Sequence, residues 1–546
     1  MGSVQLLKPF NAIFLIISVC LLLPSQSYSL NENIRVSISD NSFQKFSYQN
    51  ISVFCTKECQ LSVRNEKSSS VPIRANSIVK IEINNGVLIA QNDGKVIAKT
   101  NRPNFAILLS SQNGMFGVSG LKRCAKQALY RGSFEIVKHT NSEFFLINIL
   151  PLEDYLKGVV PNEMPVNFGI SALKAQSVAA RNYAIHERIT EFKEFDLFDS
   201  VSSQVYFGYN TENEVSNKAI LETRGIVMTS NGKTILARYH STSGGCTENS
   251  ENVFSDLKTN KFPGTPDKCL LGRRDFQSKA DLSVEKNARE FYTSTPKSFE
   301  SESKYFRWKY EWAHDDLIKI LRKTVAENAR TGFVNNPNVI NSIDKITDIK
   351  VKRRGISGKI MEVDVVTNTG VITIKKELIF RKIFLFNGKI LPSANVVFSL
   401  KRDHLGNLSK ITAYGGGFGH GVGMSQYGAA YMGQKLKLNF VQILKRYYSN
   451  ISISTIPLSL KSETKPKNKF SFFAPTKKAR LAFYNIIGNG KVTISINGKL
   501  LNISLDKNTK TKKLDISSYL LKGQNAISVQ GKTTDMLNAT FCVEFL

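Results

Sequence analysis

The sequence predicts an α+β protein, in which a mixed α/β domain lies between an N-terminal β-rich region and a C-terminal β-sandwich. Short alternating apolar stretches with Asn-Gly and Asp-Gly turns fill residues 31–125. Strand patterns and helical patterns then alternate up to about residue 455, and a β-hairpin pattern follows near the C-terminus. The 546 residues, 42% hydrophobic and 22% charged, have the composition of a globular protein with several domains.

The first residues have the features of an export signal. Lys8 precedes an apolar run at 14–23, and the residues at 27–29 have the small-x-small pattern of a cleavage site. The run is shorter than the roughly 20 residues that a membrane-spanning helix needs. Residues 1–29 are therefore predicted to be a cleaved signal peptide, with an uncleaved anchor or lipidation at Cys20 as the alternative. The mature chain is expected to have no transmembrane span and to act in the periplasm, in the cell envelope or outside the cell.

The net charge narrows the choice of partners. Lys and Arg number 74 against 44 Asp and Glu, which gives a formal charge of +30. A charge of this size favours polyanions such as nucleic acid, anionic lipid headgroups or acidic wall polymers. Because export separates the chain from nucleic acid, the cell wall and the membrane surface remain as partners.

Changes in sequence pattern place the domain boundaries. Residues 30–128 form the N-terminal β-rich region, and residues 129–457 form the mixed domain. The mixed domain begins with a buried strand pattern at 144–150 and continues with a helical pattern at 171–188. Residues 458–470 are polar and lysine-rich, which predicts a solvated linker.

Residues 471–546 are predicted to form a jelly-roll-like β-sandwich. Alternating apolar residues on both sides of Asn497-Gly498 indicate a hairpin with a two-residue turn. The segment at 514–529 resembles the turn and strand of galactose-binding-like jelly rolls that are appended to carbohydrate-active enzymes. The module is therefore expected either to bind carbohydrate or to serve only as a stabilising spacer.

The first candidate site lies in LPLEDYLKGVVPNEMPVNFGISALKAQSVAARNYAI, at residues 150–185. Glu163 follows an apolar stretch and precedes Met164-Pro165, where the proline blocks helix formation. Desolvation at such a position raises the pKa of a carboxyl group, so that it can donate a proton near neutral pH. Arg181 lies in the final turns of the alanine-rich helix that follows. Each residue taken alone could also be an ordinary surface charge.

The second candidate site is the polar loop YHSTSGGCTENSENVF, at residues 239–254. Its hydroxyl groups and its Gly-Gly turn suit the recognition of sugar hydroxyls. His240, Ser241 and Ser243 are therefore candidate substrate-binding residues. The alternative is an ordinary solvated loop.

Two cysteines of this region allow two chemistries. Cys246 and Cys269 could pair as a disulfide, which is the simpler interpretation in an oxidising compartment. Together with His240 they could instead ligate zinc, although their spacing matches no common zinc signature. The metal therefore stays unassigned, and no cofactor is expected to be required.

The third candidate site is YGGGFGHGVGMSQYGAAYMGQ, at residues 414–434. Its glycines do not satisfy G-x-G-x-x-G and no Gly-Lys-Ser/Thr follows, which excludes the common nucleotide-binding loops. Six glycines in residues 415–423 instead allow close approach of the backbone to a ligand or partner. His420, Gln426 and Tyr427 are candidate substrate-binding residues in a cleft, and a tight structural loop is the alternative.

In this order, the three segments resemble the stage II sporulation protein D family, also called the LytB or amidase-enhancer family. The similarity covers about residues 130–455 and includes ITDIKVKRRGISGKIMEVDVV at 346–366. Members are similar to lytic transglycosylases that cut peptidoglycan glycan strands, preferably strands without stem peptides. The resemblance implies that Glu163 is the catalytic glutamate and that Arg181 is the motif arginine. Some relatives bind zinc near the second segment, a pattern that His240 and Cys246 match only in part.

A lytic transglycosylase uses one carboxyl group where a hydrolase uses two. Glu163 is expected to protonate the oxygen between MurNAc and GlcNAc and then to accept the proton of the muramoyl 6-hydroxyl, which yields 1,6-anhydro-MurNAc. Glu153 and Asp154 have the pattern of ordinary turn charges. Arg181 is expected to bind the N-acetyl group or to orient Glu163. A direct contact would lower the pKa of Glu163 and oppose its role as an acid.

Two other functions fit the same sequence. The domain could bind glycan strands without cutting them and stimulate a cell-wall amidase as its partner. The chain could also be an exported adhesin that binds sugars through its C-terminal sandwich, but this function leaves the three segments unexplained.

Overall fold

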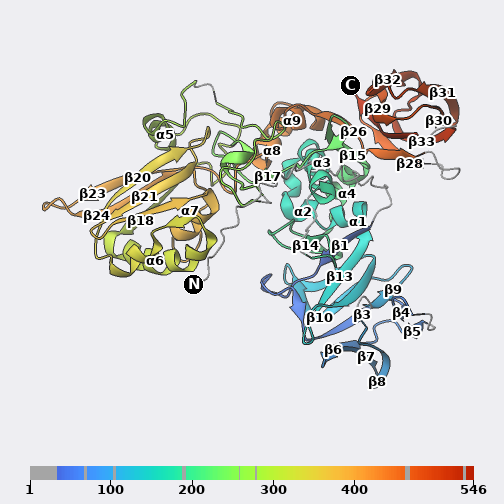
Figure 1. Ribbon diagram of the computed structural model, residues 1–546, viewed down its shortest axis with the longest axis horizontal. Coiled ribbons are helices and arrows are strands. Elements are labelled where there is room, and N and C mark those ends of the chain that lie inside the picture. Colours follow the sequence, from blue (N-terminus) through green and yellow to red (C-terminus); the bar gives the residue numbers. More distant parts are fainter. Residues whose placement is uncertain are drawn as a thin grey trace, which may run out of the picture.

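The computed structural model describes residues 33–546 except 67–69, 103–105, 187–191, 257–258, 277–278, 462–467 and 533–536. Helices lie at the centre of the molecule with β-sheets around them, and the predicted α+β class with β-rich flanking regions is confirmed (Figure 1). The predicted signal peptide, residues 1–29, lies outside the described residues. Within the described residues, no helix is long and apolar enough to cross a membrane.

The N-terminal region consists of two mainly antiparallel sheets. Its strands are β1 (Asn33–Ser37), β2 (Ser47–Tyr48), β3 (Asn50–Cys55), β4 (Cys59–Val63), β5 (Val71–Ile73), β6 (Val79–Asn84), β7 (Val87–Asn92), β8 (Lys95–Thr100), β9 (Ala106–Ser110), β10 (Phe116–Arg123), β11 (Lys126–Tyr130), β12 (Ser133–Lys138), β13 (Phe144–Pro151) and β14 (Leu197–Phe198). One sheet has the order β14-β1-β13-β12-β9-β4-β5 with β2 beside β13, and the other has the order β11-β10-β3-β6-β7-β8. Because β12 and β13 belong to the first sheet, the β-rich region extends to Pro151, beyond the boundary predicted at residue 128.

The central domain is built around one buried helix. Its helices are α1 (Leu152–Lys157), α2 (Val160–Glu163), α3 (Ile170–His186), α4 (Glu214–Leu221), α8 (Gln426–Gln434) and α9 (Phe440–Tyr447). Its short strands are β15 (Ile226–Ser230), β16 (Lys233–Thr234), β17 (Tyr239–His240), β25 (Met424–Ser425) and β26 (Ser452–Thr455). The alanines of α3 are buried, so that α4, α8, α9 and β15 pack closely against it. The first and third sequence segments therefore meet in one core.

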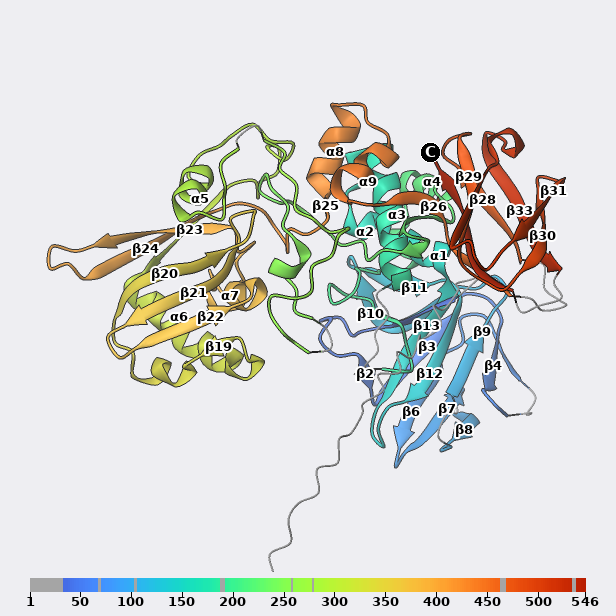
Figure 2. The ribbon, with the colours of Figure 1, turned by 45° about the horizontal axis from the view of Figure 1, so that its top comes forward.

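A separate α/β unit is inserted between the second and third segments. It contains α5 (Glu285–Tyr292), β18 (Trp308–Ala313), α6 (His314–Asn328), β19 (Val334–Asn335), β20 (Ile346–Arg354), β21 (Ile360–Thr367), β22 (Val371–Lys375), α7 (Glu377–Ile383), β23 (Val396–Arg402) and β24 (Leu408–Gly415). The strands form the sheets β18-β24-β23 and β19-β22-β21-β20. The main apolar core of this insertion is separate from the core of the rest of the chain. Figure 2 shows the insertion and the C-terminal strands on opposite sides of the central helices.

The C-terminal region is the predicted two-sheet sandwich. Its strands are β27 (Leu458–Lys461), β28 (Asn468–Ala474), β29 (Ala479–Ile487), β30 (Gly490–Ile496), β31 (Lys499–Leu505), β32 (Thr511–Asp515), β33 (Gly523–Lys532) and β34 (Asn538–Phe545). One sheet has the order β28-β33-β30-β31, and the other contains β34-β29-β32. The predicted hairpin is β30–β31, and its turn residues Asn497 and Gly498 have φ values of 52° and 87°.

The sandwich and the central domain share a β-sheet. Leu458–Lys461 and Asn468–Ala474, which include both ends of the predicted linker, form strands β27 and β28. Strand β34 pairs with β26 and β27, so that one sheet runs β16-β15-β26-β34-β29-β32 through both regions. The linker predicted at 458–470 is therefore wrong at its two described ends, where the backbone is paired in strands, and residues 462–467 between them lie outside the described residues.

We expect the central domain and the sandwich to lose stability together. Phe541 on β34 is fully buried in the shared core, and its replacement by alanine should cost about 3–5 kcal/mol. In the full-length Phe541→Ala variant, backbone amide hydrogens should then exchange faster in β26 and β15 as well as in the sandwich. Phe473→Ala, at a partly exposed residue of β28, is the matched control. Acceleration confined to residues 468–546 would show that the sandwich is an independent domain.

Candidate active site

Glu163 lies at the end of the one-turn helix α2. The backbone becomes extended at Met164 and Pro165 follows, so the helix stops at the carboxylate. Oε1 of Glu163 accepts a 2.7 Å hydrogen bond from the backbone N–H of Val205, and Tyr239 provides a side-chain hydrogen bond. Burial raises the pKa of Glu163 to about 7, and the two hydrogen bonds oppose this rise. Glu163 can therefore carry or release a proton near neutral pH.

A chain of buried polar groups orients Tyr239. Gln204 donates from Nε2 to the Tyr239 hydroxyl at 2.8 Å, and its Oε1 accepts from the Tyr155 hydroxyl at 3.2 Å. Because the oxygen of Tyr239 already accepts from Gln204, its proton is free to point toward Glu163. Burial raises the pKa of Tyr239 well above its usual value, so the phenol remains a hydrogen-bond donor.

The second and third sequence segments pair directly beside this carboxylate. Tyr239 and His240 of β17 lie parallel to Met424 and Ser425 of β25. Two further backbone hydrogen bonds, of 3.2 and 2.7 Å, join Thr242 and Phe418. Since Tyr239 contacts Glu163, the three segments that resemble the family motifs converge on one site.

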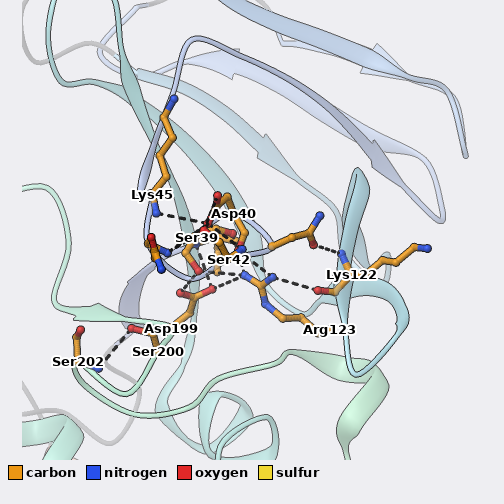
Figure 3. Close-up of polar contacts among 12 residues, drawn as sticks. Ser39, Asp40, Ser42, Lys45, Lys122, Arg123, Asp199, Ser200 and Ser202 are labelled. Atoms are coloured by element: carbon orange, nitrogen blue, oxygen red, sulfur yellow. Dashed lines mark hydrogen bonds and ion pairs between the residues drawn. The ribbon is translucent and has the colours of Figure 1, made fainter. Parts of the chain in front are cut away.

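A buried ion pair anchors the loop that supplies Val205. Arg123 of β10 and Asp199 are both fully buried, with Nη2 and Oδ2 2.8 Å apart (Figure 3). Ser39 donates to Asp199 from its hydroxyl at 2.7 Å and from its backbone N–H at 3.1 Å. The N-terminal sheets therefore hold the loop that supplies a hydrogen bond to Glu163.

Both motif histidines are neutral and fix the backbone of the site. Burial lowers the pKa of His240 to about 3 and lowers that of His420 well below its usual value. Nδ1 of His420 accepts from Val422 N–H at 3.0 Å, and its ring also bonds the backbone of Tyr239. Nδ1 of the buried His240 donates to the Val422 carbonyl at 3.1 Å. The two histidines thereby tie the second segment to the third.

Ser243 belongs to a buried turn that the insertion holds in place. The buried carboxylate of Glu300 accepts the N–H groups of Ser243, Gly244 and Gly245 at 2.8, 2.7 and 2.9 Å. The Ser243 hydroxyl accepts from Gly245 N–H at 3.1 Å. The contacts of Ser243 thus define the turn, and its side chain does not lie on an open surface.

The other predicted binding residues lie at the junction of α3 and α8. Gln426 is buried, and its Nε2 lies 3.4 Å from Oε1 of Gln176. Tyr427 is partly exposed and packs edge-on against Phe168, with ring centroids 4.8 Å apart. Ser241 is also partly exposed, and its carbonyl accepts from Tyr427 N–H. Ser241 and Tyr427 are therefore accessible to a ligand, whereas Gln426 is not.

Arg181 has no contact with Glu163. It is fully buried and makes a two-point ion pair with Glu153, Nε to Oε1 at 2.9 Å and Nη2 to Oε2 at 2.7 Å. It also donates to the carbonyl of Ile226 at 3.0 Å, and Glu153 accepts from Gly225 N–H. The expected roles of Arg181 in substrate binding or in orienting Glu163 are thus wrong. Because a buried guanidinium needs a partner, Glu153 is not an ordinary turn charge.

The predicted Cys246–Cys269 disulfide is also wrong. Both thiols are free, and the two side chains pack in separate apolar clusters. His240 lies beside His420, with ring centroids 5.5 Å apart, while Cys246 packs against Phe291 and its neighbours. In the described parts of the chain, no three His, Cys, Asp or Glu residues are placed to hold a metal ion. In these described parts, His240, Cys246 and Cys269 therefore do not form one metal site.

Several residues of the site were not predicted. Tyr239 is the first residue of the second segment, and this position could have identified it as a residue of the site. Gln204 and Val205 lie in a stretch without a recognisable pattern, and only the fold brings them to Glu163. The ion pair of Asp199 with Arg123 could not be predicted either, because the two residues are distant in sequence.

We expect Arg181→Met to destabilise the fold by about 3–5 kcal/mol, because Glu153 then loses its buried partner. Replacing both residues, in Glu153→Leu/Arg181→Met, should recover much of this loss. Lys174→Ala, on the same helix but in a partly exposed pair with Glu222, should cost less than about 1 kcal/mol. Chemical unfolding monitored by circular dichroism measures all three. A stable Arg181→Met protein would contradict the structural role.

Two family patterns match this chain. The pattern of the stage II sporulation protein family (SpoIID) matches residues 140–230, which include Glu163. A domain of unknown function (DUF8618) matches residues 248–423 and so covers the insertion.

Three curated proteins are similar to this chain over part of their length. The amidase enhancer of Bacillus subtilis is 31% identical over 322 residues, which are 55% of this chain and 40% of the relative. Stage II sporulation protein D of Bacillus amyloliquefaciens is 28% identical over 56% of this chain and 74% of the relative. An uncharacterised protein of Brachyspira hyodysenteriae is 27% identical over 64% of this chain and 76% of the relative. The chain thus spans less than half of the amidase enhancer. The resemblance seen in the sequence is confirmed by these matches, and residues 140–230 match the pattern of the stage II sporulation protein family.

Proposed function

We propose that this protein is a peptidoglycan lytic transglycosylase that cleaves the MurNAc–GlcNAc bond, with Glu163 as its single acid and base. The observation that carries the proposal is the pKa of Glu163, which burial raises to about 7. A general acid works best when its pKa lies near the working pH, because both protonation states are then accessible.

The reaction needs two proton transfers at one carboxyl group. Protonated Glu163 donates its proton to the glycosidic oxygen, the bond between this oxygen and C1 of MurNAc breaks, and GlcNAc leaves. The Glu163 carboxylate then takes the proton of the muramoyl 6-hydroxyl, whose oxygen bonds to C1. The product is a 1,6-anhydro-MurNAc end, and no water is consumed. Val205 N–H and the Tyr239 hydroxyl stabilise the carboxylate between the two transfers.

The surroundings of Glu163 support a mechanism with one carboxyl group. Burial, rather than a neighbouring negative charge, raises its pKa. Glu153 is neutralised by Arg181, and Asp199 is neutralised by Arg123. A hydrolase would need a second carboxyl group to activate water or attack the sugar. The proposed steps involve only acid–base chemistry and therefore require no cofactor.

The proposed substrate is the glycan strand of peptidoglycan, preferably without stem peptides. The protein is proposed to be exported and to meet this substrate outside the cytoplasm. Removal of the peptide leaves a carboxylate on each muramic acid, and the chain carries a net charge of +30. Complementary charge of this kind increases the local concentration of substrate at the protein surface. The C-terminal sandwich is a candidate for a second glycan contact.

A non-catalytic role is the second candidate function. The relative from Bacillus subtilis is named an amidase enhancer, so the same site could bind strands and stimulate a cell-wall amidase. In that case Glu163 would contribute to binding and would not transfer protons.

Product analysis separates the two functions. Wild-type protein should release fragments from purified, peptide-free strands that end in anhydro-muramic acid, lighter by one water than hydrolysis products. Glu163→Gln keeps the shape of the side chain but cannot transfer the proton, so the rate should fall about 10²–10⁴-fold. Glu214→Gln, on the exposed first turn of α4, should cut like wild type. Mass spectrometry of the fragments measures these results.

Hydrated reducing ends from the wild type would show a hydrolase with a second, unidentified carboxylate. If neither wild type nor Glu163→Gln cuts strands and both stimulate an amidase equally, the enzyme proposal fails and the enhancer role is supported.

A further inference from the structure

Two aromatic rings meet where the insertion joins the third segment. Phe418, in the glycine-rich loop, and Tyr305, in the insertion, stack with ring centroids 4.4 Å apart and an interplanar angle of 22°. Phe418 is 41% exposed, and Tyr305 is partly exposed. A large apolar side chain that is exposed while its backbone is fixed can contact a ligand.

The backbone under this pair is held by several hydrogen bonds. Gly417 N–H donates to the Tyr305 carbonyl at 2.7 Å, and the indole of Trp308 donates to the Gly417 carbonyl at 3.2 Å. Phe418 exchanges two backbone hydrogen bonds with Thr242. Gly417 has a φ of +93°, and a Cβ there would lie 2.9 Å from the carbonyl oxygen of Thr242. Only glycine fits, and the rings are presented by a preorganised element.

The backbone that carries the pair is connected to a residue that contacts the proposed catalytic carboxylate. Thr242, the partner of Phe418, is three residues beyond Tyr239, whose hydroxyl bonds Glu163. Tyr239 and Phe418 therefore belong to the same paired backbone of the second and third segments. A strand that extends from Glu163 along this backbone can place a neighbouring sugar against the rings.

The chemistry of the pair suits a muramic acid unit. The faces of a pyranose present C–H groups, which pack on the electron-rich face of an aromatic ring. Nζ of the exposed Lys304 lies 5.1 Å from the centre of the Tyr305 ring. An ammonium group at this position can pair with the lactyl carboxylate that remains on muramic acid after the stem peptide has been removed.

We propose that Phe418 and Tyr305 form a stacking subsite for a sugar next to the bond at Glu163, with Lys304 binding the muramic acid carboxylate. This subsite rests on the proposed function for the identity of its ligand. It also gives the insertion a role, because Tyr305 and Lys304 both belong to the insertion and Phe418 belongs to the third segment.

The test uses the full chain in the Glu163→Gln background, which is expected to bind strands without cutting them. The two tryptophans of the chain, Trp308 and Trp312, both lie on β18, so that tryptophan fluorescence reports binding at this surface. The probes are peptide-free strand fragments, which carry lactyl carboxylates, and chitin oligosaccharides, which carry none. Calorimetry of the same titrations provides a second measurement of affinity.

Phe418→Leu and Tyr305→Leu keep apolar bulk and should each weaken binding of both probes about tenfold. Lys304→Gln should weaken binding of the strand fragments but leave chitin affinity unchanged. Tyr209→Leu, at a 38% exposed tyrosine that packs on Arg131, should bind both probes like the parent. Equal melting temperatures confirm that the variants are folded.

The subsite is overturned if Phe418→Leu and Tyr305→Leu bind like Tyr209→Leu, or if the parent binds neither probe. The rings then only cover the junction between insertion and central domain. Failure of the proposed enzyme looks different. If Phe418→Leu loses binding while protein with Glu163 intact never cuts, the subsite stands and the chain is a binding protein.

Discussion

The chemistry proposed for the site depends on one desolvated carboxyl group, that of Glu163. Burial of Glu163 disfavours its charged form. The hydrogen bonds from Val205 N–H and the Tyr239 hydroxyl stabilise the carboxylate and keep it accessible. The balance between burial and these hydrogen bonds sets the pKa near 7. Neither effect alone gives a group that can donate a proton and then take one back. Each hydrogen-bond donor comes from a different part of the chain, so the pKa of Glu163 depends on the tertiary fold.

The surrounding modules all support this environment. The N-terminal sheets anchor the Val205 loop through the Arg123–Asp199 pair, and the insertion fixes the Gly-Gly turn through Glu300. The C-terminal sandwich shares a sheet with β15 and β26, next to α3. The flanking regions are thus structural partners of the site, and the insertion also contributes the proposed subsite.

The sequence patterns predicted the features that depend on residues adjacent in sequence. The desolvation of Glu163 and the alanine-rich helix α3 follow from neighbouring residues, and the structure agrees with both predictions. The short helix α2 that ends at Glu163 was not predicted. Contacts between distant residues were not predicted. Nothing near Arg181 in the sequence shows that Glu153 neutralises it, because Arg181 and Glu153 meet only when α1 packs on α3. The shared sheet escaped prediction for the same reason, since strand pairing between β34 and β26 leaves no local pattern.

The pH dependence of strand cleavage tests the central claim most directly. Glu163 must be protonated for the first step, and its pKa is about 7, so kcat/KM should fall about tenfold per pH unit above pH 7. Tyr239→Phe removes a hydrogen bond that lowers this pKa, and should therefore move the fall to higher pH. A rate that already falls from about pH 4.5, the ordinary value for glutamic acid, would contradict the account. So would a fall that does not move in Tyr239→Phe.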